Sequence, residues 1–126
     1  MSFDWQNYLT LAQYMMDTAE EFPETEACYR SVVSRAYYAM FCMTRDYVSQ
    51  VDGQDFYSND HRALQDYLTN HPHKVRQKIG NQLRRLHQHR KKADYDRDLG
   101  EAPVNKAKKA LCEAQRVLEG LTQIYM

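Results

Sequence analysis

Glycine, proline and long apolar runs are scarce in this sequence. Its 126 residues include four glycines and three prolines, fewer than the turns of an all-β protein need. No apolar run approaches the roughly eighteen residues of a membrane-spanning helix. No basic segment opens the chain either, since the first basic residue is Arg30, so the pattern of a secretory signal is missing. The sequence predicts a soluble cytoplasmic protein without a membrane segment.

Cysteine is also sparse, and the common catalytic motifs are missing. The three cysteines, Cys28, Cys42 and Cys112, form no metal-like spacing, and we expect reduced, mostly buried thiols. The chain contains no P-loop, no glycine-rich dinucleotide fingerprint and no Ser/His/Asp order of a hydrolase. We therefore expect no cofactor.

One segment of the chain has no basic residue, and another has no acidic residue. The formal net charge is zero, but residues 1–29 carry six acidic side chains and no lysine or arginine. Residues 71–93 carry eight basic side chains and no acidic one. This asymmetry indicates an anionic partner for the basic segment or complementary surfaces on two subunits. The alternative is a pair of solvated helix faces.

Apolar residues recur three or four positions apart along most of the chain, which is typical of amphipathic helices. The expected helices cover residues 5–19, 27–51, a short segment around Leu64 and Leu68 capped by Ser58 or Asn59, 75–93 and 103–125. The second has two apolar stripes and should lie centrally. The sequence predicts one all-α domain over residues 1–126, an up-down four-helix bundle plus one short extra helix.

The predicted fourth helix is the candidate for binding phosphate groups. Its basic side chains lie opposite its apolar stripe. The candidate phosphate-binding residues are Arg84, Arg85, Arg90, Lys91 and Lys92. No aromatic residue is interleaved with them for base stacking. These residues would therefore recognise the phosphates and the shape of a nucleic acid rather than its base sequence. A solvated basic face is the alternative.

All five histidines lie between positions 61 and 89. On a helix, His87 and His89 point about 200° apart and cannot hold one metal ion. His71 and His73 flank Pro72 without a third ligand nearby, so no metal site is predicted. A neutral His87 or His89 beside arginines could instead act as a general base.

Arg35 stands out because it lies midway along the predicted central helix. A buried arginine requires a carboxylate partner. The acidic turn after the fourth helix supplies the nearest candidate, and we predict a structural ion pair between Arg35 and Asp94.

Three segments occur in the order of a known family. They are "SRAYYAMF" at 34–41, His61 at the start of the short helix, and "RKKADYD" at 90–96. The chain resembles the HEPN domain, the higher-eukaryote and prokaryote nucleotide-binding helical domain. It is most similar to small prokaryotic members with S-R-x-Y-Y-A-x-F and R-x-x-A-D-Y motifs. The resemblance covers essentially the whole chain and implies a bundle of four to five helices that forms a homodimer.

The resemblance also implies a range of activities. Many relatives are metal-independent ribonuclease toxins, or partners of a nucleotidyltransferase antitoxin in a two-gene toxin–antitoxin pair. Active nucleases of the family use an Arg-x4–6-His motif, in which two subunits place arginine and histidine in one cleft. Counted from Arg90, the histidine position is occupied by Tyr95, while Arg84 and His89 have the same spacing further upstream.

A tyrosine with a pKa near 10 is a poor general base at pH 7. The candidate catalytic residues are Arg90, Tyr95 and His89. The sequence therefore favours a protein that binds RNA, a nucleotide or a cognate nucleotidyltransferase. A ribonuclease toxin and a structural dimerising helix bundle are the alternatives.

Overall fold

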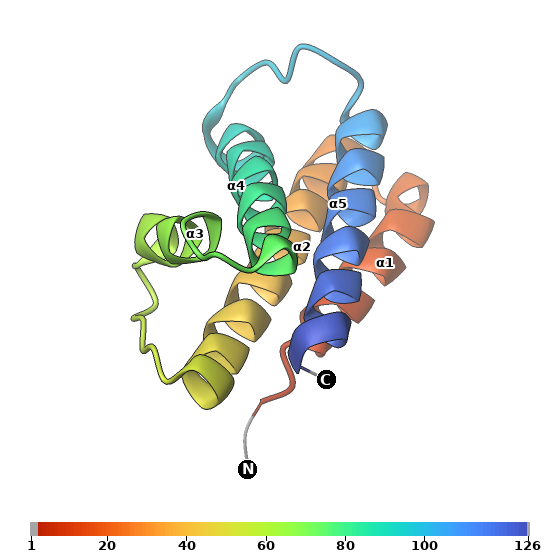
Figure 1. Ribbon diagram of the computed structural model, residues 1–126. Helices are drawn as coiled ribbons and strands as arrows, with labels where there is room; N and C mark the ends of the chain where they lie inside the picture. Colours follow the sequence, from red (N-terminus) through yellow and green to blue (C-terminus); the bar gives the residue numbers. More distant parts are fainter. Residues whose placement is uncertain (1–2, 126) are drawn as a thin grey trace.

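The computed structural model describes residues 3–125, and every regular element within them is helical (Figure 1). The α-helices are α1 (Gln6–Thr18), α2 (Thr25–Tyr47), α3 (His61–Thr69), α4 (Lys74–Tyr95) and α5 (Pro103–Tyr125). A 3-10 turn, Ala19–Glu21, extends α1, and a π-helical turn, Val48–Asp52, extends α2. Helices α1, α2, α4 and α5 run alternately up and down, with the short α3 at the side. This confirms the predicted all-α bundle.

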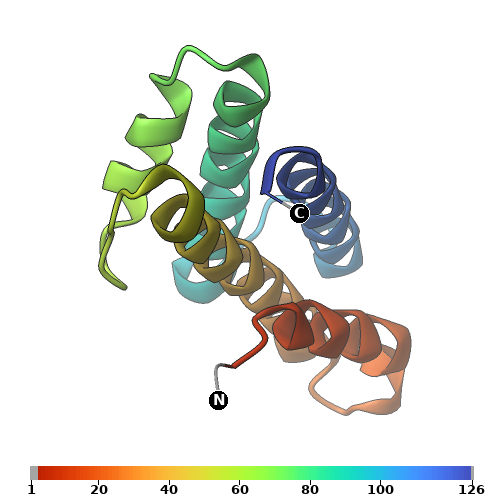
Figure 2. The same ribbon diagram turned by 60° about the horizontal axis from the view of Figure 1, so that its bottom comes forward.

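Helix α2 is the central element. It lies between α1 on one side and α4 and α5 on the other (Figure 2). Its core side chains point both ways, as the two apolar stripes predicted. The fully buried residues of α2 include Val32, Val33, Ala36, Tyr37, Ala39 and Met40. Because α2 contacts three helices, it also brings its side chains next to α4, where the candidate site lies.

Gly80 explains how the short α3 packs so closely on α4. A Cβ atom at Gly80 would lie 2.8 Å from Cγ2 of Thr69 and 2.9 Å from the backbone nitrogen of Thr69. A glycine inside a helix costs about 1 kcal/mol relative to alanine. Here the missing side chain allows α3 to approach the α4 backbone.

Two helix starts differ from the prediction. Helix α2 begins at Thr25, before the predicted start at residue 27. Helix α3 is preceded by Asp60, not by Ser58 or Asn59 as the capping residue. The Asp60 carboxylate does not cap the helix but accepts a hydrogen bond from the backbone nitrogen of Tyr57 at 2.8 Å. At α5 the expectation is confirmed, since Pro103 is its first residue.

The C-terminal end of α4 is fastened to α2 by Arg30. Its guanidinium donates hydrogen bonds to the carbonyl oxygens of Ala93 at 2.9 Å, Asp96 at 2.6 Å and Arg97 at 3.1 Å. Carbonyls at the end of a helix have no partner within the helix, and a cation stabilises them. Arg30 therefore fixes the position of the turn that follows Tyr95.

The cysteines are free, but they are less buried than expected. Cys42 is buried, Cys28 is partly buried and Cys112 is exposed. In the part of the chain that the structure describes, no helix has the length and apolar character needed to cross a membrane.

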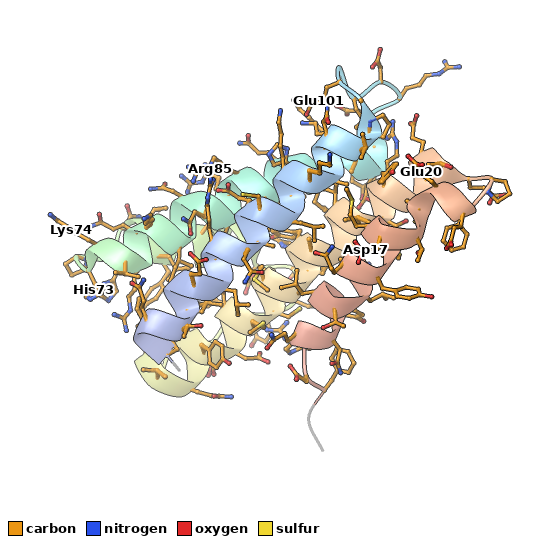
Figure 3. The ribbon with its side chains drawn as sticks, turned by 90° about the vertical axis from the view of Figure 1, so that its right-hand side faces the viewer. Asp17, Glu20, His73, Lys74, Arg85 and Glu101 are labelled. Carbon is orange, nitrogen blue, oxygen red and sulfur yellow. The ribbon has the colours of Figure 1, made fainter. Side chains whose placement is uncertain are left out.

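The two charged segments lie on different sides of the molecule. Asp17 and Glu20 belong to α1 and the 3-10 turn that follows it, whereas Lys74 and Arg85 belong to α4 (Figure 3). Helix α5 passes between these two groups in this view. Acidic and basic residues are therefore presented on separate surfaces.

Candidate functional site

Helices α2 and α4 and the start of α1 enclose an open cavity of about 360 Å³. We call it the arginine–tyrosine pocket. Its lining consists of Trp5, Tyr8, Ser34, Arg35, Tyr38, Cys42, Arg90 and Asp94. Two arginines and three aromatic residues thus come from three different segments of the chain.

Arg90 is held in place at this pocket by several partners. Its Nη2 donates a hydrogen bond to the Tyr38 hydroxyl at 2.6 Å. Its Nε lies 2.9 Å from Oδ2 of Asp94. That contact is a close ion pair, although the N–H does not point along a regular hydrogen-bond direction. Its Cζ lies 5.0 Å from the Tyr38 ring centroid, and the side chain is 15% exposed. The guanidinium is therefore largely fixed before any ligand arrives.

The predicted ion pair between Arg35 and Asp94 is wrong. Among residues 3–125 Asp94 forms its ion pair with Arg90, one helical turn earlier on α4, the usual spacing for such pairs. From α2, it is the neighbouring Ser34 that reaches Asp94, donating a hydrogen bond at 3.3 Å. The Cζ of Arg35 instead lies 5.0 Å and 5.3 Å from the ring centroids of Tyr8 and Tyr38. These ring faces attract its charge.

Tyr95 supplies the most accessible aromatic ring near Arg90. It is 74% exposed, and its ring centroid lies 5.6 Å from the Arg90 Cζ. Exposed aromatic rings stack on nucleobases, and arginines bind phosphates bidentately. The middle of α4 has no aromatic residue for base stacking. Tyr95 supplies one at the end of the helix, beside Arg90.

His89 does not join Arg90 and Tyr95. Its Nδ1 accepts a hydrogen bond from Nζ of Lys106 on α5 at 3.2 Å. His87 lies on another side of α4, where its Nδ1 accepts a hydrogen bond from the amide of Gln65 on α3 at 3.0 Å. The structure therefore brings together two of the three candidate catalytic residues.

His87 belongs to an aromatic stack in the core. Its ring centroid lies 4.8 Å from that of Tyr37 and 4.9 Å from that of His61. Tyr37 Oη and His61 Nδ1 share a hydrogen bond at 2.5 Å. Burial, followed by the charges of His61 and nearby cations, lowers the pKa of His87 to about 4. A base this weak is poorly matched to proton transfer at pH 7.

The five predicted phosphate-binding residues point in three directions. Arg84 faces α3, with its Nη2 2.9 Å from Oδ1 of Asp66. Arg85 faces α5, with its Nη2 2.9 Å from Oε1 of Glu113. Arg90 faces α2. Lys91 and Lys92 are exposed, and within residues 3–125 neither forms an ion pair. The basic segment is therefore several small sites rather than one continuous surface.

Several residues of the pocket were not singled out from the sequence. Ser34 and Tyr38 belong to the segment "SRAYYAMF", which is a usable sequence signal. Trp5 and Tyr8 lie at the start of the chain, where only the apolar spacing of the first helix marks them. Over the described residues the structure contains no group of three or more histidine, cysteine or acidic side chains that could hold a metal ion.

The chain matches one family model over nearly its whole length. The model of the HEPN domain matches residues 5–124, which include every residue of the arginine–tyrosine pocket. Searches among curated proteins and among solved structures give no significant match.

Proposed function

Since the chain belongs to the HEPN family, we propose that it binds RNA or a nucleotide in the arginine–tyrosine pocket. Membership of this family points to an RNA-binding or nuclease-like function. The observation that carries the proposal is the position of Arg90, held by Tyr38 and Asp94 at an aromatic-lined cavity. We further propose that the protein is one component of a prokaryotic toxin–antitoxin or nucleotidyltransferase pair.

The pocket offers both contacts that a single-stranded nucleic acid needs. Phosphate oxygens would accept hydrogen bonds from Arg90 and Arg35, because both arginines line the pocket and both are partly exposed. A base would stack on the exposed Tyr95 ring. Recognition of this kind reads phosphates and base faces, so it would tolerate many sequences.

Binding is favoured over cleavage by the surroundings of Arg90. Tyr95 occupies the place of the expected histidine, and His89 is turned toward α5. His87 is stacked in the core. Among the described residues, the lining of the arginine–tyrosine pocket contains no histidine that could move a proton.

A ribonuclease is the second candidate, and one observation favours it. Arg84 and His87 line the same open cavity of about 490 Å³ between α3 and α4, together with Lys91 and others. An arginine and a histidine in one cavity could stabilise charge and transfer a proton. The low pKa of His87 is the argument against it.

The first experiment measures binding of a labelled single-stranded oligoribonucleotide at low salt. We expect Arg90→Gln to weaken binding about tenfold and to reduce the salt slope by about one, since one phosphate contact is lost. Tyr95→Ala should weaken binding by a similar factor through lost stacking. Arg62→Gln is the matched control, because Arg62 is an arginine that is 92% exposed on α3. Equal losses for Arg90 and Arg62 would sink the proposal.

The same samples test cleavage. If the protein binds without cutting, the oligoribonucleotide should stay intact over hours. Cleavage that is abolished by His87→Ala and kept by His73→Ala would instead establish the ribonuclease. His73 is an exposed histidine just before α4 and is a suitable control.

The partner and the dimer are tested separately. We propose a homodimer in which two copies of Arg90 face one cleft, and light scattering of the purified chain should give twice the monomer mass. Co-expression with the product of the neighbouring gene should yield a complex if that product is the proposed nucleotidyltransferase partner. A monomer that copurifies with nothing would reduce the proposal to binding by a single chain.

A further inference from the structure

We propose that α4 and α5 form a second site, a pocket that binds a phosphate group. An open pocket of about 240 Å³ is lined by Arg85, Gln88, His89, Lys92 and Lys106. This lining contains three cations, one histidine and no carboxylate. It lies on a different side of α4 from Arg90, which faces α2. The site is therefore separate from the arginine–tyrosine pocket and does not depend on its function.

Lys106 is the central observation. It is only 8% exposed, and it lies in the first turn of α5, where the helix dipole disfavours a cation. Among the described residues its ammonium makes one hydrogen bond, to Nδ1 of His89. The nearest carboxylate oxygen, Oε1 of Glu101, is 3.8 Å away and accepts a hydrogen bond from Lys109 at 3.2 Å. A buried, incompletely paired cation is stabilised by a bound anion.

His89 adds a donor to the same pocket. Because its Nδ1 accepts the hydrogen bond from Lys106, the neutral ring carries its proton on Nε2. Burial lowers the pKa of His89, as do the neighbouring charges of Lys106 and Lys109, while Glu113 and Glu101 act in the opposite direction. The ring is therefore a neutral donor at pH 7 that an incoming anion would make more basic.

The nearby carboxylates are already occupied. Glu113 accepts hydrogen bonds from Arg85 at 2.9 Å and from Arg116 at 3.2 Å. Glu101 is shared by Lys109 and Lys106. Arg85 on α4 and Glu101 in the loop just before α5 can be located in Figure 3. Each acid thus faces two cations, which leaves an excess of positive charge for a phosphate.

The ligand chemistry is a phosphate group, whichever molecule carries it. The sources to distinguish are a terminal phosphate of an RNA, an internal phosphodiester and free inorganic phosphate. A terminal or free phosphate carries more charge than a diester, and lysine and arginine clusters bind it more strongly.

The first test is an NMR titration of the histidine side chains in sodium phosphate and in sodium chloride of equal ionic strength. We expect the pKa of His89 to rise by at least half a unit in phosphate. The resonances of His73, an exposed histidine beyond the other end of α4, serve as the control and should respond equally in the two salts. An unchanged His89 pKa in phosphate, with the protein folded, would overturn the proposal.

The second test compares oligoribonucleotides with a 5′-phosphate and with a 5′-hydroxyl end. Lys106→Met keeps the buried hydrocarbon stem and removes the charge. Lys108→Met removes an exposed lysine two positions later and is the control. We expect Lys106→Met to weaken binding at least fivefold and Lys108→Met less than twofold. Equal losses for the two lysines would count against the pocket.

The pattern of losses identifies the source. A loss confined to the 5′-phosphorylated strand indicates a terminal phosphate, and equal losses on both strands indicate an internal phosphodiester. If only the inorganic phosphate titration responds, the pocket binds free phosphate. Failure of RNA binding through Arg90 would leave this titration unaffected, so the two proposals can fail independently.

Discussion

Two sides of α4 each carry an arginine and a histidine, but these residues are held by other side chains on one side and are more exposed on the other. On the inner side, Arg90 is bonded to Tyr38 and Asp94, and His87 is stacked on Tyr37. On the outer side, the Arg85 side chain is 57% exposed, and His89 lines an open pocket. The inner residues are locked by other helices. The outer ones remain available to a ligand.

This difference shows why a count of charges does not define a binding surface. An arginine that is held by a carboxylate and a ring contributes to stability as well as to a site. An arginine at the surface contributes little to stability, because water screens its ion pair. Substitutions on the inner side of α4 should therefore affect stability as well as binding, whereas those on the outer side should affect binding with little change in stability.

The largest expected effect concerns the inner aromatic stack. Tyr37 is fully buried, and its ring contacts His61, His87 and Phe41. Tyr37→Ala should lower the free energy of unfolding by about 3–5 kcal/mol, since it removes a large buried ring and leaves a cavity. Urea unfolding of this variant checks the value.

Two controls accompany this variant. Tyr95→Ala removes the exposed ring on α4 and should change stability by less than about 0.5 kcal/mol. Tyr37→Phe keeps the ring but loses the bond to His61, with a cost of about 1 kcal/mol. Similar losses for Tyr37→Ala and Tyr95→Ala would break the distinction between the two sides.

A middle-sized effect is expected from pH. The pKa of His87 is about 4 in the folded protein and 6.5 in an unfolded chain. The unfolded chain therefore binds the proton first as pH falls. The stability that the neutral ring contributes is complete above pH 6.5 and is lost as pH falls from 6.5 towards 4. Because the ring is only partly buried, we expect a loss of about 1–2 kcal/mol.

Urea unfolding at several pH values measures this dependence. His87→Phe should flatten the profile between pH 6.5 and 4, since phenylalanine binds no proton. His73→Phe should leave it unchanged, because His73 is exposed. The stack also contains His61, whose pKa burial lowers too, so part of the slope should survive in the His87 variant. A profile that is equally steep in both variants would contradict the assignment.

The fold was predictable because it depends on spacing within each helix. The apolar residues of α5 recur without interruption from Val104 to Tyr125, and the helix has the expected extent. Helical spacing also predicted that His87 and His89 diverge, and they bond to α3 and α5 respectively. Such periodicity is a property of one segment and can be read without its neighbours.

The site was less predictable because it depends on how helices are positioned relative to each other. The sequence places Arg35 and Asp94 on two adjacent helices. It does not determine how far one helix is shifted along the other or how each is rotated about its axis. Ser34 rather than Arg35 proved to be the residue that reaches Asp94. Likewise, Lys106 lies beside His89 only because α5 packs against α4 in this register. Contacts between distant segments carry no periodic signal.

The smallest expected effects compare the two arginines directly. Arg90→Gln should cost about 1–2 kcal/mol, since the half-buried Tyr38 hydroxyl and the Asp94 carboxylate lose a charged donor. Arg85→Gln should cost less than about 0.5 kcal/mol, because Glu113 keeps its contact with Arg116. Unfolding curves of both variants in low and high salt measure this difference. Salt should reduce the small effect at Arg85 and leave most of the effect at Arg90, since the Arg90 side chain is only 15% exposed and partly buried pairs are screened much less. If the two substitutions lower the free energy of unfolding equally, the side chains on the inner side of α4 are held no more firmly than those on the outer side.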